Sequence, residues 1–183
     1  MKSIIIYKGK YGATKQYAEW LGEELNLPVL SAELAETGQL ISADFYIIGS
    51  SVYIGKLQIG KWLKKNLTTL KNKKIIFFQV GGTPPGETEK RQAYNLSSIP
   101  GELIGQCDFY FLPGRLVKKK LLWFDKFMLK MGSRLTKDAK EKERMLTDYD
   151  DVKKENIRGI VTAVREMAGS SDKLYKAVTF ATL

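Results

Sequence analysis

Three short stretches of small and hydroxyl-bearing residues are the parts of this chain best suited to bind a ligand. The first, Lys8 to Thr14, contains two glycines and ends on a threonine. Glycines let the backbone turn tightly and present its N–H groups, and a helix that follows adds positive potential. The hydroxyl of Thr14 adds a further donor, so the stretch can cradle a phosphate, although an ordinary turn can have the same composition.

The other two stretches favour contact with a flat ring. They are Gly49 to Gly55 and Val80 to Pro84. Small residues let the backbone approach a ring closely, and Tyr53 offers a face for stacking. The first stretch is neither a Walker A motif nor a G-x-G-x-x-G fingerprint, which argues against nucleoside triphosphates and dinucleotides.

Side-chain catalysis has few candidates in this sequence. There is no histidine, which removes Ser-His and Cys-His schemes and makes a transition-metal site improbable. Cys107 is the one cysteine and stands in an apolar run, so we interpret it as a buried structural residue and not as a redox nucleophile. An enzyme of this composition must take its chemistry from a cofactor.

The elements that position these stretches follow from alternating apolar patterns. Strands are expected over the following ranges: 2–7, 28–30, 44–49, 74–80 and 108–112. Helical patterns lie between them, at 14–25, along Ile59, Trp62, Leu63 and Leu67, at 87–95, and from Ile157 to Ala168. This alternation predicts an α/β fold with a five-stranded parallel sheet in the order 2-1-3-4-5, helices on both faces, and a ligand crevice between strands 1 and 3. All three stretches then lie at the carboxyl edge of the sheet.

The domain organisation is expected to be simple. Residues 1–169 form one domain with a basic insertion at about 114–142, and 170–183 form a tail with a short β-like run, Ala177 to Phe180. No signal peptide or membrane-spanning stretch is evident, so we expect a cytoplasmic protein. The sequence does not decide whether the protein also contacts the inner face of the cell membrane.

The sequence resembles the flavodoxin superfamily, and within it the menaquinone-dependent protoporphyrinogen IX dehydrogenase branch. The residues that carry the likeness are Gly12-Ala13-Thr14, the run from Ile48 to Tyr53, the block from Trp123 to Met131 after Pro113-Gly114-Arg115, and Thr147-Asp148-Tyr149. The Trp-aromatic-Asp-basic-Phe-Met block is the more specific of these. The flavodoxin likeness covers residues 1–112 and the last helix.

The resemblance implies FMN as cofactor and no catalytic side chain. It places the FMN phosphate on Lys10, Tyr11, Gly12, Ala13 and Thr14. It places the isoalloxazine ring against Ser50, Ser51, Val52, Tyr53, Ile54 and Gly55, and against Val80, Gly81, Gly82 and Thr83. This chain has Lys8 and Gly9 where flavodoxins usually carry hydroxyl side chains, and Lys10 can compensate as a point charge.

The insertion is the most unusual part of the sequence. The chain has thirty Lys and Arg against twenty Asp and Glu, a net charge of +10, and the segment Arg115 to Arg134 carries seven cations and one acid, Asp125. Aromatic and apolar residues share one helical face there, which suits an anionic membrane surface. A helix packed on the domain with a solvated lysine face has equal weight, and nucleic-acid binding is disfavoured because the aromatics cluster.

The function that the resemblance implies is that of an FMN-dependent oxidoreductase in heme biosynthesis. Its flavin takes electrons from a porphyrinogen and passes them to a quinone or a redox partner protein. The alternative is a soluble electron-transfer flavodoxin without a substrate of its own, which would not need the insertion. A phosphoacceptor receiver domain is disfavoured, because strand 3 ends in Gly49-Ser50 and not in the aspartate that its chemistry requires.

Overall fold

The apolar runs form one sheet because they are hydrophobic on both faces and must be covered by helices on each side. The computed structural model describes residues 2–84, 86–136 and 138–181. Its strands are β1 (Ser3–Lys8), β2 (Val29–Ser31), β3 (Phe45–Tyr53), β4 (Lys56–Leu57), β5 (Lys74–Gly81) and β6 (Cys107–Pro113). Strands β2-β1-β3-β5-β6 are parallel, so the predicted 2-1-3-4-5 order is confirmed, and β4 is an additional antiparallel strand beside β3.

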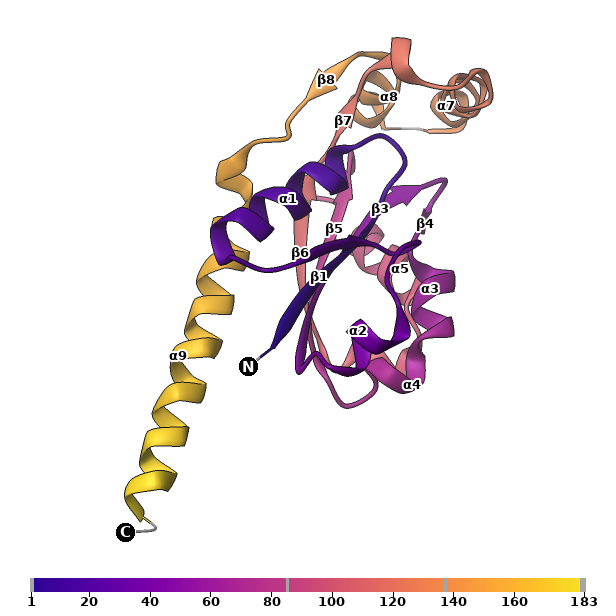
Figure 1. Ribbon diagram of the computed structural model, residues 1–183. Helices are drawn as coiled ribbons and strands as arrows, with labels where there is room; N and C mark the ends of the chain where they lie inside the picture. The colour runs from indigo at the N-terminus through magenta and orange to yellow at the C-terminus, as the bar shows by residue number, and fades with distance from the viewer. Residues whose placement is uncertain (1, 85, 137, 182–183) are drawn as a thin grey trace.

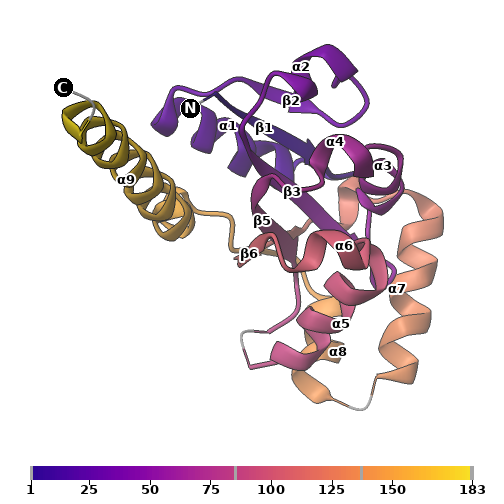
Figure 2. The same ribbon diagram turned by 90° about the horizontal axis from the view of Figure 1, so that it is seen from below.

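Helices cover the two faces of the sheet (Figures 1 and 2). One face is covered by α1 (Ala13–Leu25), the turn η2 (Lys154–Ile157) and the first part of α9 (Arg158–Ala181). The other side carries α2 (Thr37–Ile41), α3 (Gly60–Lys65), α4 (Leu67–Leu70), α5 (Thr88–Ser98) and α6 (Gly101–Ile104). The helical stripe expected from Ile59 to Leu67 is broken at Asn66, where ψ is 15° and α4 begins a new turn.

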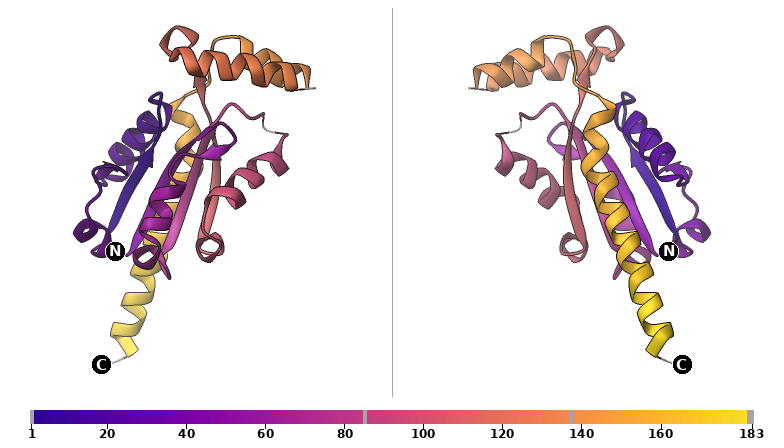
Figure 3. Two further views of the ribbon diagram at one scale, coloured as in Figure 1. Left: turned by 90° about the vertical axis from the view of Figure 1, so that its right-hand side faces the viewer. Right: turned by 90° about the vertical axis from the view of Figure 1, so that its left-hand side faces the viewer.

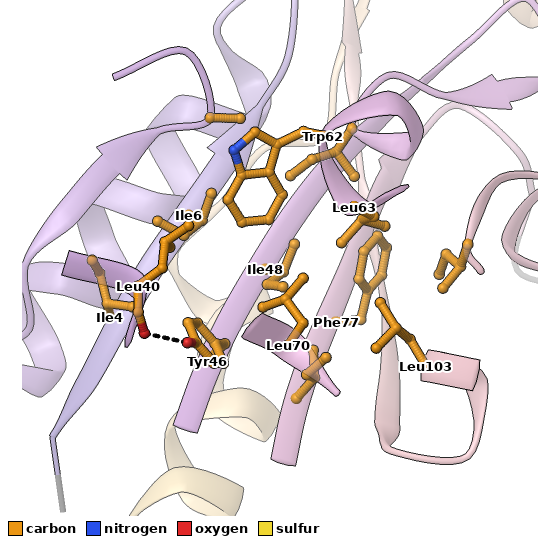
Figure 4. Packing of buried hydrophobic residues seen from close by; sticks show 14 of the residues in the cluster. Ile4, Ile6, Leu40, Tyr46, Ile48, Trp62, Leu63, Leu70, Phe77 and Leu103 are labelled. Carbon is orange, nitrogen blue, oxygen red and sulfur yellow. Dashed lines mark hydrogen bonds between the residues drawn. The ribbon is translucent and has the colours of Figure 1, made fainter. Parts of the chain in front are cut away.

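The core on the α3 side illustrates how alternate strand residues lock the helices in place (Figure 4). Ile48 and Phe77 project from β3 and β5 against Leu63 and Leu103, and all four are buried. Tyr46 is also buried, and its hydroxyl donates a hydrogen bond to the carbonyl of Leu40, which ties α2 to the sheet.

The insertion lies across the carboxyl ends of the strands (Figures 1 and 3). It consists of β7 (Arg115–Leu116), the 3-10 turn η1 (Lys118–Lys120), α7 (Trp123–Leu135), α8 (Ala139–Leu146) and β8 (Tyr149–Asp150). Strand β7 pairs with β8 in an antiparallel ribbon. The insertion therefore continues beyond residue 142, and the chain returns to the domain after this ribbon.

Two local expectations were wrong. Residues 50–53 do not belong to a loop but prolong β3, because Ser50 and Ser51 pair with β5, and Val52 and Tyr53 pair with β4. The segment 177–180 is not β-like: α9 continues to Ala181, since no proline interrupts the sequence after Gly169. Residues 182 and 183 of the expected tail lie outside the described residues. Within the described ranges, no helix is both long and apolar enough to cross a membrane.

Gly49 provides a test of the sheet packing. A Cβ added there would lie 2.0 Å from the Phe78 ring, whereas one added at Gly101 would have no neighbour within 4 Å. We expect Gly49→Ala to lower the free energy of unfolding by about 1–3 kcal/mol through overpacking. Gly101→Ala is the control and should not be destabilised by any clash. Urea unfolding of both variants gives the comparison, and equal stability of Gly49→Ala and wild type would contradict the packing described here.

Candidate functional site

The parallel register brings the three predicted stretches to one edge of the sheet. Lys8 at the end of β1 is paired with Ser50 of β3, and Ser51 is paired with Val80 of β5. Each strand then leaves the sheet on the same side, as parallel strands must. The expected convergence of the loops is therefore present in the structure.

The first loop leaves a buried oxygen in need of a partner. Gly12 has φ +85° at the N-terminus of α1, a left-handed conformation that favours glycine. Thr14 is buried, and its Oγ1 has no hydrogen-bond partner among the residues that the structure describes. The first N–H groups of a helix also have no intrahelical acceptor. A phosphate at this helix terminus would satisfy both, so the loop fits the phosphate of FMN.

The approach of this loop to Thr14 is close. A Cβ added at Gly9 would lie 2.6 Å from Thr14 Oγ1 and 3.4 Å from Ser51 Oγ. A glycine at position 9 therefore leaves room for the Thr14 side chain and brings the first loop beside β3. The absence of a hydroxyl side chain at Gly9, which departs from the usual flavodoxin sequence, has this steric explanation.

The second stretch is the end of a hairpin. Ile54 and Gly55 both have positive φ, +48° and +70°, at the turn between β3 and β4. A β-branched residue such as Ile54 is strained in this conformation, and such strain is typical of functional sites. Ser50 is buried and its Oγ accepts from the Ile59 N–H at 3.2 Å, so its side chain is not free for a ligand.

The third stretch is held from outside by two arginines and a tyrosine. Arg144 Nε donates to the Gly82 carbonyl at 3.2 Å, and Arg91 Nη2 donates to the Thr83 carbonyl at 2.9 Å. The Arg144 guanidinium lies 4.1 Å from the centre of the Tyr149 ring, and the Tyr149 hydroxyl occupies the space of a side chain at Gly82. Burial raises the pKa of Tyr149, which keeps its hydroxyl protonated. Val80 is buried in the core, so its side chain does not face the edge.

One carboxylate of the insertion joins the first two stretches. Asp125 of α7 is only 5% exposed. Its Oδ2 accepts from Lys10 Nζ at 2.7 Å and from the Tyr11 hydroxyl, and its Oδ1 accepts from the Tyr53 hydroxyl at 2.5 Å. The hydrogen bond to Asp125 raises the pKa of Lys10. We call Lys10, Tyr11, Tyr53 and Asp125 the Asp125 cluster.

The rest of α7 is oriented in an unexpected way. Asp125 and Ser133 face inward and are buried, whereas Trp123 is 79% and Phe127 52% exposed. Trp123 packs edge to face only on its exposed neighbour Phe124, with ring centres 5.9 Å apart. The helix packs on the domain through Asp125, and its lysines Lys126 and Lys130 are exposed, as one of the two interpretations expected. The packed side is polar, however, and the aromatic side is open.

Two other features do not belong to this site. Burial raises the pKa of the Cys107 thiol to about 12, so it is protonated at neutral pH and is a poor nucleophile. An open groove of about 630 Å³ runs along α1, lined in part by Trp20 and Val29. It includes Gly12 but none of the other residues of the three stretches.

Sequence reasoning missed the residues that the insertion contributes. Asp125, Arg144 and Tyr149 were not candidates, and neither was Arg91 of α5. Asp125 did carry a signal, since it is the one acid in a segment with seven cations. Tyr149 lies in the Thr147-Asp148-Tyr149 run of the resemblance. No sequence signal pointed to Arg91 or Arg144, because the positions of these side chains depend on how α5 and α8 pack.

The chain is similar to curated proteins and to solved structures. The quinone-dependent protoporphyrinogen IX dehydrogenase of Escherichia coli K12 is 24% identical over 185 residues, covering 94% of this chain and 98% of that protein. Among solved structures, an archaeal flavodoxin has a TM-score of 0.45 at 19% identity, covering 65% of this chain and 87% of its own. Megasphaera elsdenii flavodoxin has a TM-score of 0.46 at 16% identity, covering 61% and 85%.

The family itself is established by a match that spans most of the chain. A family model described as a flavodoxin domain matches residues 4–143, from the first strand into α8. The strand order and the first loop agree with that match. The chain therefore belongs to the flavodoxin domain family and is an FMN-binding oxidoreductase.

Proposed function

We propose that this protein oxidises a porphyrinogen and passes the electrons through FMN to a quinone. The observation that carries the proposal is the uncovered aromatic face of α7, the helix that Asp125 holds against the loops proposed to bind FMN. An apolar donor needs an apolar surface close to the flavin, and a quinone needs the same. FMN supplies the redox chemistry, and the protein supplies binding, orientation and exclusion of water.

The residues proposed to hold FMN are those of the three stretches. Thr14, the N–H groups of residues 10–14 and the Lys10 cation would bind the phosphate. The hairpin end from Ser50 to Gly55 and the strand end from Val80 to Thr83 would bind the ring. Ser50 and Val80 contribute backbone alone, since their side chains are buried.

We further propose that the insertion contacts an anionic membrane surface, where apolar donors and quinones reside. Lys118, Lys119 and Lys120 are exposed at η1, and Lys126 and Lys130 are exposed on α7. These cations lie beside the exposed aromatic residues, which is the composition of an interfacial helix. The membrane itself would then cover the apolar face that the protein leaves open.

The alternative is a carrier flavodoxin that exchanges electrons only with other proteins. It has the same FMN loops, and the exposed aromatic face would then receive a partner protein. Reduction of the flavin by a porphyrinogen distinguishes the two functions, because the flavin of a carrier is not reduced by that substrate.

Thr14 tests the phosphate site without disturbing the fold. Thr14→Val keeps the shape of the buried side chain and removes a hydroxyl that has no partner in the described structure. We expect apoprotein stability to be unchanged or slightly higher, while FMN binding weakens by about 1.5–3 kcal/mol through loss of a hydrogen bond to a charged group. Fluorescence titration with FMN measures the affinity, and the exposed Thr68→Val on α4 is the matched control. An unchanged FMN affinity of Thr14→Val would remove Thr14 from the site.

The aromatic face is tested by turnover. Trp123→Ala with Phe127→Ala should lower porphyrinogen oxidation with a quinone more than it lowers FMN affinity, because these rings are exposed and lie outside the cofactor loops. For the same reason the melting temperature should hardly change. Leu34→Ala with Ile41→Ala removes two equally exposed apolar side chains elsewhere and should leave turnover intact. Normal turnover of the aromatic variant would favour the carrier.

Replacing lysines of the insertion tests the proposed contact with a membrane. Replacing Lys118, Lys119 and Lys120 by glutamine should weaken binding to anionic vesicles by about 1 kcal/mol for each lysine and should reduce the salt dependence of binding. The control replaces three exposed lysines of α3, Lys61, Lys64 and Lys65. Vesicle sedimentation at several salt concentrations measures the effect. Equal losses in both variants would show that net charge alone attracts the protein.

A further inference from the structure

Asp125 is an unusual residue in this protein. It is the only acidic side chain that is buried in the part of the chain whose side chains are described. A buried carboxylate is costly unless its oxygens are well paired. Here Lys10, Tyr11 and Tyr53 provide three donors, all from outside the insertion. The helix that carries Asp125 therefore attaches to the domain by charge and hydrogen bonds where most helices use apolar contacts.

The cluster bridges two loops that bind different parts of one cofactor. Lys10 and Tyr11 belong to the first loop, and Tyr53 ends β3 beside the hairpin turn. The Lys10 ammonium also lies 4.6 Å from the centre of the Tyr53 ring. The Leu122 N–H donates to the Tyr11 hydroxyl at 3.4 Å, so the start of α7 is fastened at the same point. The carboxylate closes the edge of the site between the two loops.

Lys10 can pair either with Asp125 or with the phosphate of a bound FMN. Two lysines of this loop are ion-paired, Lys8 with Glu33 at 3.0 Å and Lys10 with Asp125 at 2.7 Å, and the partner of Lys10 is the one that lies on the insertion. A phosphate there would compete with Asp125 for Lys10 and would repel the carboxylate. Binding and release of FMN must therefore disturb the contact that holds α7.

Apolar packing is sparse at the first turn of α7, whereas the later part of the helix packs on Met145 of α8. Leu121 is buried at the start of α7, but the neighbouring Leu122, Trp123 and Phe124 are exposed. The other end is held separately, by Arg144 on Gly82 and by Lys90 on Glu141 of α8. The α7 end can thus open while the α8 end stays attached.

We propose that Asp125 is a latch that fastens α7 across two FMN loops and sets how fast FMN enters and leaves. Asp125 is in this role a positioning residue, since it acts through Lys10, Tyr11 and Tyr53. The inference rests on FMN binding at these loops. When Asp125 is bound to the two loops, FMN is retained while the aromatic face of α7 contacts an apolar surface.

The test compares rates of FMN exchange in Asp125→Asn and wild type. The amide keeps the size of the side chain but loses the ion pair with Lys10 and an acceptor oxygen. We expect association and dissociation of FMN each to become at least about tenfold faster, with a smaller change in their ratio. Stopped-flow quenching of FMN fluorescence gives association, and its recovery after dilution of the holoprotein gives dissociation. Asp148→Asn is the control, because Asp148 is exposed and accepts from the Lys118 N–H within the insertion, away from the first two stretches.

The other outcomes are separable. Faster association with slower dissociation would mean that Asp125 merely repels the phosphate, and this result would overturn the latch, as would unchanged rates. If Asp125→Asn does not fold, Tyr11→Phe is the second variant. It removes one hydroxyl of the Asp125 cluster and should still speed FMN dissociation about twofold to tenfold. An unchanged rate in that variant would also overturn the latch.

Wild-type protein without FMN affinity would instead contradict the cofactor site. Hydrogen exchange provides a readout besides FMN: Asp125→Asn should expose amides of residues 121–135 and leave those of α8 protected.

Discussion

The parallel pairing of β1 with β3 and of β3 with β5 is the constraint on which the rest of this structure depends. Parallel strands need crossover helices, and the crossovers bring every strand end that precedes a helix to one edge. The register then sets Lys8 beside Ser50 and Ser51 beside Val80. The phosphate loop, the hairpin end and the third loop are neighbours for this reason, although some seventy residues of sequence separate the first from the last.

The insertion uses that edge in a way that inverts the usual pattern of an amphipathic helix. The side of α7 that carries Asp125 faces the domain, and its aromatic side faces outward. The cost of burying a carboxylate is offset by three donors on the first two stretches, and the cost of exposing aromatic rings is offset only when another surface covers them. In the proposed function, the same helix connects the cofactor site on one side with an apolar partner on the other.

The sequence predicted the parallel sheet, its order and the convergence of the three stretches, because these follow from apolar periodicity and handed crossovers. It did not predict that β3 runs on to Tyr53, since that depends on pairing with the short strand β4. It left the orientation of α7 undecided, because a helical pattern shows which residues share a face and not which face meets the domain. Arg91 and Arg144 reach the third loop only through the packing of α5 and α8, which no local pattern encodes.

We propose that FMN on this domain accepts electrons directly from a porphyrinogen. The most direct measurement mixes FMN-loaded protein, in more than threefold molar excess, with protoporphyrinogen IX in the absence of oxygen and of quinone, and follows the visible absorbance of the flavin. We expect the flavin to be bleached as porphyrin fluorescence appears, with three FMN reduced for each porphyrin formed, because each FMN gains two electrons and two protons and the porphyrinogen loses six of each. Added quinone should then restore the oxidised spectrum. A flavin that stays oxidised with the porphyrinogen but is reduced by dithionite would contradict it and identify a carrier.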